Sequence, residues 1–160
     1  MKRIAICLLP CVLLGACLTA PKECPVNPSN PATETFAPSL GVDLNNMERT
    51  SLGDYRQDVV VGTGAQLDSL QVVQIHYSAY LSDGTLVDQR TDANYLIDLS
   101  AFATAVGLAD GMLGMNVGGQ RIIVAPSELA LGACSQGTPL GTIPGNSTLI
   151  YKVELLAIGS

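Results

Sequence analysis

The stretch QIHYSAYLSDGTLVDQ, residues 74–89, contains the residue types that acid–base catalysis uses. His76 is the only histidine of the chain, and it lies next to Tyr77 with Asp83 and Asp88 downstream. An imidazole titrates near neutral pH and can move a proton between a substrate and a carboxylate. The spacing therefore raises the hypothesis that His76 is a catalytic base.

The rest of the sequence lacks the partners that such chemistry needs. A nucleophile turn of the G-x-S-x-G type is absent. GTGAQL, residues 62–67, has neither the third glycine nor the lysine of a phosphate loop. The acidic residues do not follow calcium-loop spacing, and the cysteines and the histidine lack zinc-like spacing. We therefore expect no metal site, no cofactor and no acid–base mechanism based on His76.

The element that carries His76 is predicted to be a strand, because its residue types alternate. Successive side chains of a strand point to opposite faces of the sheet. His76 falls between Gln74 and Ser78 on the polar face, where we expect it to be solvated. The other set is expected to face the core, and it consists of Val73, Ile75, Tyr77, Ala79 and Leu81.

The remaining apolar segments are short and separated by turn residues. We expect strands in DVVVGTG, TLVDQ, NYLIDL, GGQRIIVAP and STLIYKVELLAI, and a hairpin turn in SDGT, residues 82–85. Apolar residues recur at helical spacing over 101–113, which predicts one short helix capped by Ser100, although Gly107 and Gly111 weaken it. SELALGACSQGTPLGTIPGN is expected to be a long glycine-rich loop. Many antiparallel strands with one helix indicate an α+β fold.

The first residues are typical of an export signal. Two basic residues precede an apolar run that ends at Ala16, and this run is shorter than the roughly 20 residues that span a bilayer. LGAC, which ends at Cys17, is similar to a bacterial lipobox. We expect residues 1–16 to be a lipoprotein signal peptide and Cys17 to be lipidated; the alternative is an ordinary signal cut near Ala16 or Ala20. The lipid would anchor the protein to a membrane of the bacterial cell envelope, facing the periplasm or the exterior.

The segment 17–46 has the composition of a tether. It contains five prolines and many small polar residues without an apolar period. Such a composition favours an extended, flexible chain. We therefore expect a flexible Pro-rich tether over 17–46 and the folded domain over 47–160.

Charge and cysteine usage narrow the partners further. Removing residues 1–16 leaves six Lys or Arg against fourteen Asp or Glu, a formal charge of −8. Because nucleic-acid binding rests on neutralising phosphates with basic residues, we do not expect a nucleic-acid partner. Cys24 and Cys134 are the cysteines beyond Cys17, and an exported compartment permits a disulfide. The sequence leaves open whether these two approach each other.

Four longer segments carry a resemblance to a known family. VVVGTG, VQIHYSAYLSDGTLVDQ, GLADGMLGMNVGGQRIIVAPSELALG and TIPGNSTLIYKVELLAI occur in this order with short gaps. Together they resemble the FKBP-type peptidyl-prolyl isomerases from Val59 to Ile158. The resemblance implies an α+β fold, an antiparallel β-sheet wrapped around one short α-helix with an apolar pocket between them. With the export signal, it implies a lipid-anchored isomerase that binds proline-containing polypeptides and assists the folding of exported proteins at X-Pro bonds.

An enzyme of this kind needs no catalytic histidine. The prolyl amide is held planar by resonance, with a barrier of roughly 18–20 kcal/mol. The twisted amide has lost this resonance and is less polar, so an apolar pocket favours it over the planar state without proton transfer.

The resemblance also assigns the site. The expected catalytic residues, which orient the bound peptide, are Tyr77, Asp88 and Tyr151. The expected substrate-binding residues are Val87, Tyr95, Thr104, Ala105, Leu108, Ala130, Leu131 and Ile143. Three of these depart from the family, because Val87 replaces a phenylalanine, Leu108 the floor tryptophan, and Leu131 a tyrosine whose hydroxyl is lost. The alternative is therefore a peptide-binding or chaperone module of the same fold with little or no isomerase activity.

Overall fold

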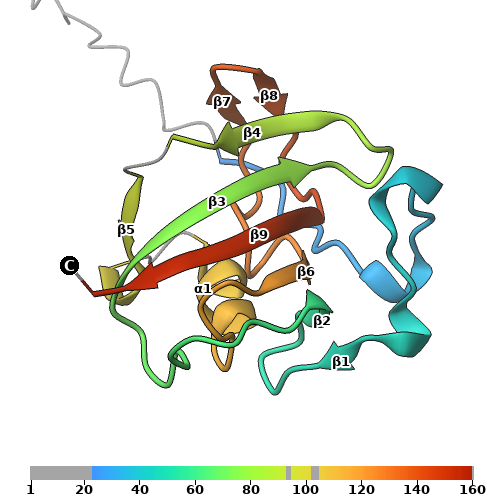
Figure 1. Ribbon diagram of the computed structural model, residues 1–160. Helices are drawn as coiled ribbons and strands as arrows, with labels where there is room; N and C mark the ends of the chain where they lie inside the picture. Colours follow the sequence, from blue (N-terminus) through green and yellow to red (C-terminus); the bar gives the residue numbers. More distant parts are fainter. Residues whose placement is uncertain (1–22, 93–94, 102–104, 160) are drawn as a thin grey trace, which may run out of the picture.

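The computed structural model describes residues 23–92, 95–101 and 105–159 (Figure 1). The predicted signal peptide, Cys17 and Thr104 lie outside the described residues. Over the described ranges, no helix is both long and apolar enough to cross a membrane.

One antiparallel sheet forms the body of the domain. Its strand order is β1-β2-β6-β9-β3-β4, and β5 pairs with β3. The central pair is β3 and β9, in which Tyr77 lies opposite Val153 and Ala79 opposite Tyr151. The strands are β1 (Glu48–Arg49), β2 (Tyr55–Val60), β3 (Val72–Tyr80), β4 (Leu86–Arg90), β5 (Leu96–Asp98), β6 (Gln120–Ala125) and β9 (Leu149–Ile158).

The expected α+β fold is confirmed, with the single α-helix of the described residues, α1 (Val106–Met112), packed on the inner face of the sheet. The glycines of this helix permit α1 to approach strand β6 closely. A Cβ atom at Gly111 would lie 2.5 Å from the Ile123 side chain, and one at Gly107 would lie 2.8 Å from the Ala125 Cβ. The inner set of β3, from Val73 to Ala79, is buried in the same core, as its alternation predicts.

The predicted start of this helix is wrong. Leu99–Ala101 forms a 3₁₀ turn, and α1 begins only at Val106. Ser100 does not cap α1, because both its backbone N–H and its hydroxyl bond Asp98 Oδ1, at 2.9 and 2.6 Å. Ala105, the residue before α1, has a non-helical backbone and makes no side-chain cap.

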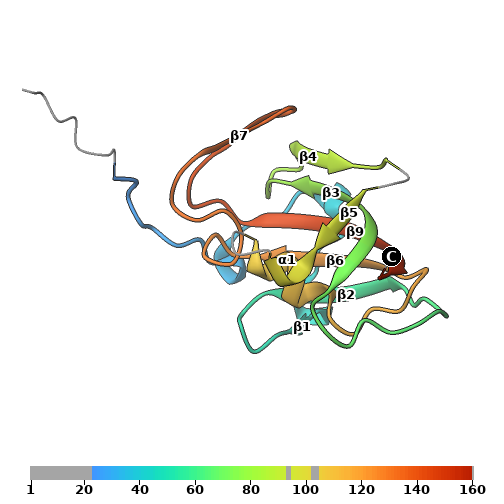
Figure 2. The same ribbon diagram turned by 90° about the vertical axis from the view of Figure 1, so that its left-hand side faces the viewer.

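The predicted long loop contains a hairpin that the sequence analysis does not anticipate. Strands β7 (Gln136–Thr138) and β8 (Gly141–Ile143) pair with each other and project beside β4 (Figure 2). The Thr138 hydroxyl donates a hydrogen bond to the Val87 carbonyl of β4, which attaches the hairpin to the sheet.

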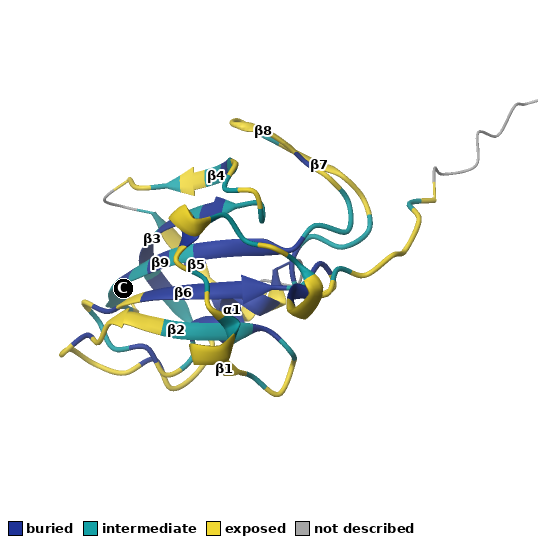
Figure 3. Cartoon of the chain, turned by 90° about the vertical axis from the view of Figure 1, so that its right-hand side faces the viewer, coloured by how far each residue is buried: buried dark blue, intermediate teal, exposed yellow. Residues whose placement is uncertain are grey.

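The prediction of a flexible tether is wrong for much of the segment that the structure describes. Three 3₁₀ turns, Pro31–Thr33, Pro38–Leu40 and Leu44–Asn46, lead the chain across the outer face of the sheet. Pro31 and Pro38 begin two of these turns, because a proline φ angle suits the first position of a helical turn. Leu40 is 1% exposed and packs in a second core with Met47, Ile122, Val124 and Ile150. β6 is therefore buried on both faces (Figure 3).

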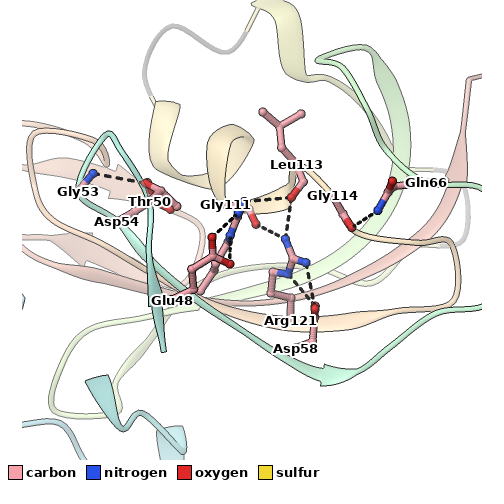
Figure 4. Close-up of polar contacts among 11 residues, drawn as sticks. Glu48, Thr50, Gly53, Asp54, Asp58, Gln66, Gly111, Leu113, Gly114 and Arg121 are labelled. Atoms are coloured by element: carbon pink, nitrogen blue, oxygen red, sulfur yellow. Dashed lines mark hydrogen bonds and ion pairs between the residues drawn. The ribbon is translucent and has the colours of Figure 1, made fainter. Parts of the chain in front are cut away.

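Arginine side chains fix the C-terminal end of α1, the element that forms the pocket floor (Figure 4). Arg121 is 6% exposed, pairs with Asp58 at 2.7 Å and donates to the carbonyls of Gly111 and Leu113 at 2.8 and 2.9 Å. Arg56 donates to the same Leu113 carbonyl at 3.1 Å. These cations satisfy carbonyls that the helix end leaves free, and their charge suits the negative end of the helix.

Candidate functional site

An apolar pocket of about 90 Å³ opens between α1, the inner face of the sheet and the connection from β6 to β9. For scale, an engineered apolar cavity of about 150 Å³ holds a benzene molecule. A pocket of this size therefore suits part of a small apolar ring that enters from outside. Its lining residues are Tyr77, Ala79, Asp88, Ala105, Leu108, Leu131, Ile143, Leu149 and Tyr151.

The structure brings most of the predicted site residues together in this pocket. All three predicted catalytic residues line it, and so do the predicted binding residues Ala105, Leu108, Leu131 and Ile143. Ala79 and Leu149 also line it but were not predicted. Strand alternation could have found them, since each lies two residues from a pocket tyrosine and on the same face.

Three predicted binding residues do not line the pocket. Val87 and Ala130 are 2% and 4% exposed, because neighbouring core residues cover their short side chains. The Tyr95 ring packs against the Tyr77 ring with 6.0 Å between the centroids, and the Arg90 guanidinium lies over the Tyr95 ring at 5.8 Å from its centroid. Tyr95 therefore supports a pocket residue without lining the pocket itself.

A short polar network fixes one wall of the pocket. The Tyr77 hydroxyl donates to Asp88 Oδ2 at 2.6 Å. Asp88 Oδ1 accepts from the Gln89 backbone N–H at 2.9 Å and from Arg90 Nη1 at 3.1 Å. Both carboxylate oxygens therefore have donors, which holds the Asp88 side chain and the Tyr77 ring in one orientation.

The two tyrosine hydroxyls of the pocket stay protonated at neutral pH. Burial raises the pKa of Tyr77 well above its ordinary value, and the hydrogen bond to Asp88 and the charge of Asp88 raise it further. Burial, followed by the Asp88 charge, raises the pKa of Tyr151 in the same direction. No described residue accepts or donates a hydrogen bond at the Tyr151 hydroxyl. This hydroxyl is therefore available to a ligand in the pocket.

His76 lies on the opposite face of the sheet from the pocket, as its strand position predicts. The expectation that it is solvated holds only in part, since its side chain is 31% exposed and its Nδ1 lies 3.5 Å from Glu154 Oε2. The N-terminal segment Pro38–Gly41 covers this part of the sheet, and a cavity of about 370 Å³ separates the two. His76 therefore cannot reach a group that is bound in the pocket beside α1.

Comparison with known proteins gives a consistent family. Residues 64–156 match the family model of the FKBP-type peptidyl-prolyl cis-trans isomerases. The chain is 34% identical over 104 residues to an FK506-binding protein of Neisseria meningitidis serogroup B, covering 64% of this chain and 93% of that protein. It is 33% identical over 112 residues to the FKBP-type isomerase FkpA of Aeromonas hydrophila, covering 70% of this chain and 40% of that protein.

Solved structures show the same likeness. A peptidyl-prolyl cis-trans isomerase from Pseudomonas syringae pv. tomato superposes with a TM-score of 0.62 at 26% identity, covering 72% of this chain and 82% of that one. FkpA from Escherichia coli superposes with a TM-score of 0.58 at 31% identity, covering 69% of this chain and 50% of that one.

Proposed function

We propose, from the premise that this chain belongs to the family of FKBP-type peptidyl-prolyl cis-trans isomerases, that it is a lipid-anchored isomerase that assists the folding of exported proteins at X-Pro bonds. One observation supports the location of the site: seven residues at positions that correspond to the family's site line one apolar pocket, although Leu108 and Leu131 differ from the family in residue type. The pocket is closed on one side by the fixed Tyr77–Asp88 pair and on another by the floor residue Leu108.

The pocket would act by binding the twisted amide better than the planar one. A prolyl ring that enters between Tyr77, Leu108 and Tyr151 leaves water, and the twisted amide loses less solvation there than the planar amide. The neutral Tyr151 hydroxyl offers a hydrogen bond to a peptide carbonyl in this dry environment. Binding that is stronger in the transition state than in the ground state is what raises the rate.

The test is the rate of cis–trans exchange of an X-Pro peptide, measured by NMR with the purified full chain. We expect clear acceleration over the uncatalysed exchange, which takes tens of seconds or longer. His76→Ala is the matched control, because it lies on the same strand as Tyr77 but on the other face. A Tyr77→Ala chain that stays folded should lose the acceleration.

A second candidate function rests on the departures at Leu108 and Leu131. The floor of the pocket is a leucine that is 1% exposed, and the rim leucine offers no hydroxyl. Aromatic contacts contribute roughly 0.5–1.5 kcal/mol each and a hydrogen bond about 1 kcal/mol, so their loss can reduce turnover. A chain that binds proline-containing peptides without accelerating their exchange would be a peptide-binding or chaperone module.

The membrane anchor is a separate part of the proposal. Its support is the export signal with LGAC at its end, and the disulfide between Cys24 and Cys134 accords with an oxidising compartment. Cys17→Ser should release the protein from the membrane fraction of cells and prevent normal signal processing. If the Cys17→Ser protein still fractionates with membranes, lipidation of Cys17 is not the anchor.

A further inference from the structure

The N-terminal strap, defined as residues Cys24–Glu34, holds the connection that forms one wall of the pocket. This connection runs from Pro126 to Thr148 between β6 and β9, and it carries both Leu131 and Ile143. A disulfide joins Cys24 of the strap to Cys134, three residues beyond Leu131, with 5.1 Å between the Cα atoms. One end of the strap is thus covalently attached beside the pocket wall.

Asn146 makes a second attachment with its side-chain amide. Its Oδ1 accepts from the Asn27 backbone N–H at 3.0 Å, and its Nδ2 donates to the Pro25 carbonyl at 2.8 Å. The Asn146 backbone N–H donates to the Gly132 carbonyl at 2.9 Å. Asn146 therefore ties the strap to both halves of the connection, the half next to Leu131 and the half next to Ile143.

Ser29 makes a third attachment at the base of the connection. The Ser29 hydroxyl accepts a hydrogen bond from the Ser127 backbone N–H at 2.7 Å, and the Ser127 hydroxyl accepts one from the Ser29 backbone N–H at 3.0 Å. The Thr148 hydroxyl lies 2.8 Å from the Ser29 hydroxyl and 2.6 Å from Glu34 Oε1. Ser127 and Thr148 are 1% and 3% exposed, so these bonds are protected from water. The strap thereby joins Ser127 and Thr148, which lie at the two ends of the connection.

We propose that the strap is a positioning element for the substrate pocket, with Asn146 and the Cys24–Cys134 disulfide as its positioning residues. The connection is long and glycine-rich, and long connections of this kind open locally unless other contacts hold them. The strap restricts Leu131 and Ile143 to their places in the wall, so that the pocket is formed before the substrate binds. Such preorganisation improves binding by lowering the cost of ordering the site. This proposal rests on the proposed binding of proline-containing peptides.

Two variants of the full chain loosen the strap in different ways. Asn146→Gly removes the bridging amide but keeps the backbone, because Asn146 has a left-handed φ of 60° that glycine adopts readily. Asn146→Asp keeps the acceptor for Asn27 and should restore part of the effect. The double variant Cys24→Ser and Cys134→Ser removes the disulfide. Leu40→Ala is the control, because Leu40 lies after the strap and packs on the outer face of the sheet, so its truncation loosens the N-terminal segment without removing a bond between the strap and the connection.

The first readout is KM and kcat for an X-Pro peptide, at a temperature where all variants are folded. We expect KM to rise about threefold or more in Asn146→Gly and in the double variant, with kcat within about twofold, because a loose wall weakens ground-state and transition-state binding alike. Leu40→Ala should lower Tm without changing KM. The proposal is overturned if Tm falls but KM is unchanged in both strap variants, or if Leu40→Ala raises KM equally.

The second readout is amide hydrogen exchange over residues 127–134, which needs no catalysis. Exchange should be faster in both strap variants and unchanged in Leu40→Ala. If the parent chain neither accelerates cis–trans isomerisation of the X-Pro peptide nor binds the peptide, the proposed function fails. The role of the strap in holding the wall is then decided by hydrogen exchange alone, and equal exchange in parent and variants refutes it.

Discussion

Asp54 provides a direct test of the packing beneath α1. It is fully buried, and its Oδ1 accepts a hydrogen bond from the Thr50 hydroxyl at 2.5 Å. Its Oδ2 has no hydrogen-bond partner among the described residues. Burial, with a smaller contribution from the nearby Asp110 carboxylate, raises the pKa of Asp54 to about 6. Asp54→Asn keeps the acceptor for Thr50 and places an amide donor on the other side, where a neutral group is favoured.

The sign of the pH dependence follows from the two states of the carboxyl group. Below about pH 4 Asp54 is protonated in both states and does not affect the free energy of unfolding. Between about pH 4 and pH 6 the unfolded chain gives up this proton and the folded chain keeps it, so stability falls as pH rises. A pKa raised by about 2 units corresponds to about 3 kcal/mol of destabilisation, which is complete above pH 6.

The assay is urea unfolding of parent and variant at several pH values, with linear extrapolation to water. Asp54→Asn should be more stable than the parent by about 1–3 kcal/mol at pH 8, and the two should converge near pH 4. Asp110→Asn should produce a smaller change in the same direction, because it removes only the neighbouring charge. A variant that is less stable than the parent at pH 8, or a difference that does not depend on pH, would refute this account of Asp54.

Three further substitutions test the pocket. Leu131→Tyr returns a hydroxyl to a half-buried position at the pocket rim. If this hydroxyl contributes about 1 kcal/mol of contact in the transition state, kcat/KM for an X-Pro peptide should rise about fivefold. An unchanged kcat/KM would show that the missing rim hydroxyl does not limit the rate. His76→Ala should leave kcat/KM unchanged. It should alter the free energy of unfolding by less than about 1 kcal/mol, since its partner Glu154 is exposed in part. A folded but inactive variant would contradict the placement of the site. Tyr77→Phe removes the bond to Asp88 and should cost about 1.5–3 kcal/mol in urea unfolding, which a silent substitution would disprove.

The inner half of the fold could be predicted because its residues obey strand periodicity. The alternation of β3 assigns Tyr77 to the core and His76 to the other face, and both assignments agree with the structure. The order of the family segments then places Tyr77, Asp88 and Tyr151 near one another. Ala79 and Leu149 follow from the same alternation but have no distinctive chemistry to draw attention to them.

The outer layer was harder to predict because it has no period. Its apolar side chains are spread over short 3₁₀ turns between prolines and polar residues, a composition that also describes a tether. One signal was present in β6, where every residue from Ile122 to Ala125 is apolar. Such a run is typical of a strand buried on both faces, so some other segment had to cover the outer face. Which segment does so depends on tertiary packing, and the approach of Cys24 to Cys134 depends on it too.

If Cys17 carries the proposed lipid anchor, the attachment of Cys24 would also limit how far the domain can lie from the membrane. A fully extended chain advances at most about 3.3–3.6 Å per residue. Cys24 lies seven residues after Cys17, so a lipid on Cys17 would hold the disulfide within ~25 Å of the bilayer surface. A tether that stayed free as far as Met47 would instead allow ~100 Å. Because Cys134 lies beside the pocket wall, an anchored chain would present its pocket to polypeptides close to the membrane surface and would not reach those farther away.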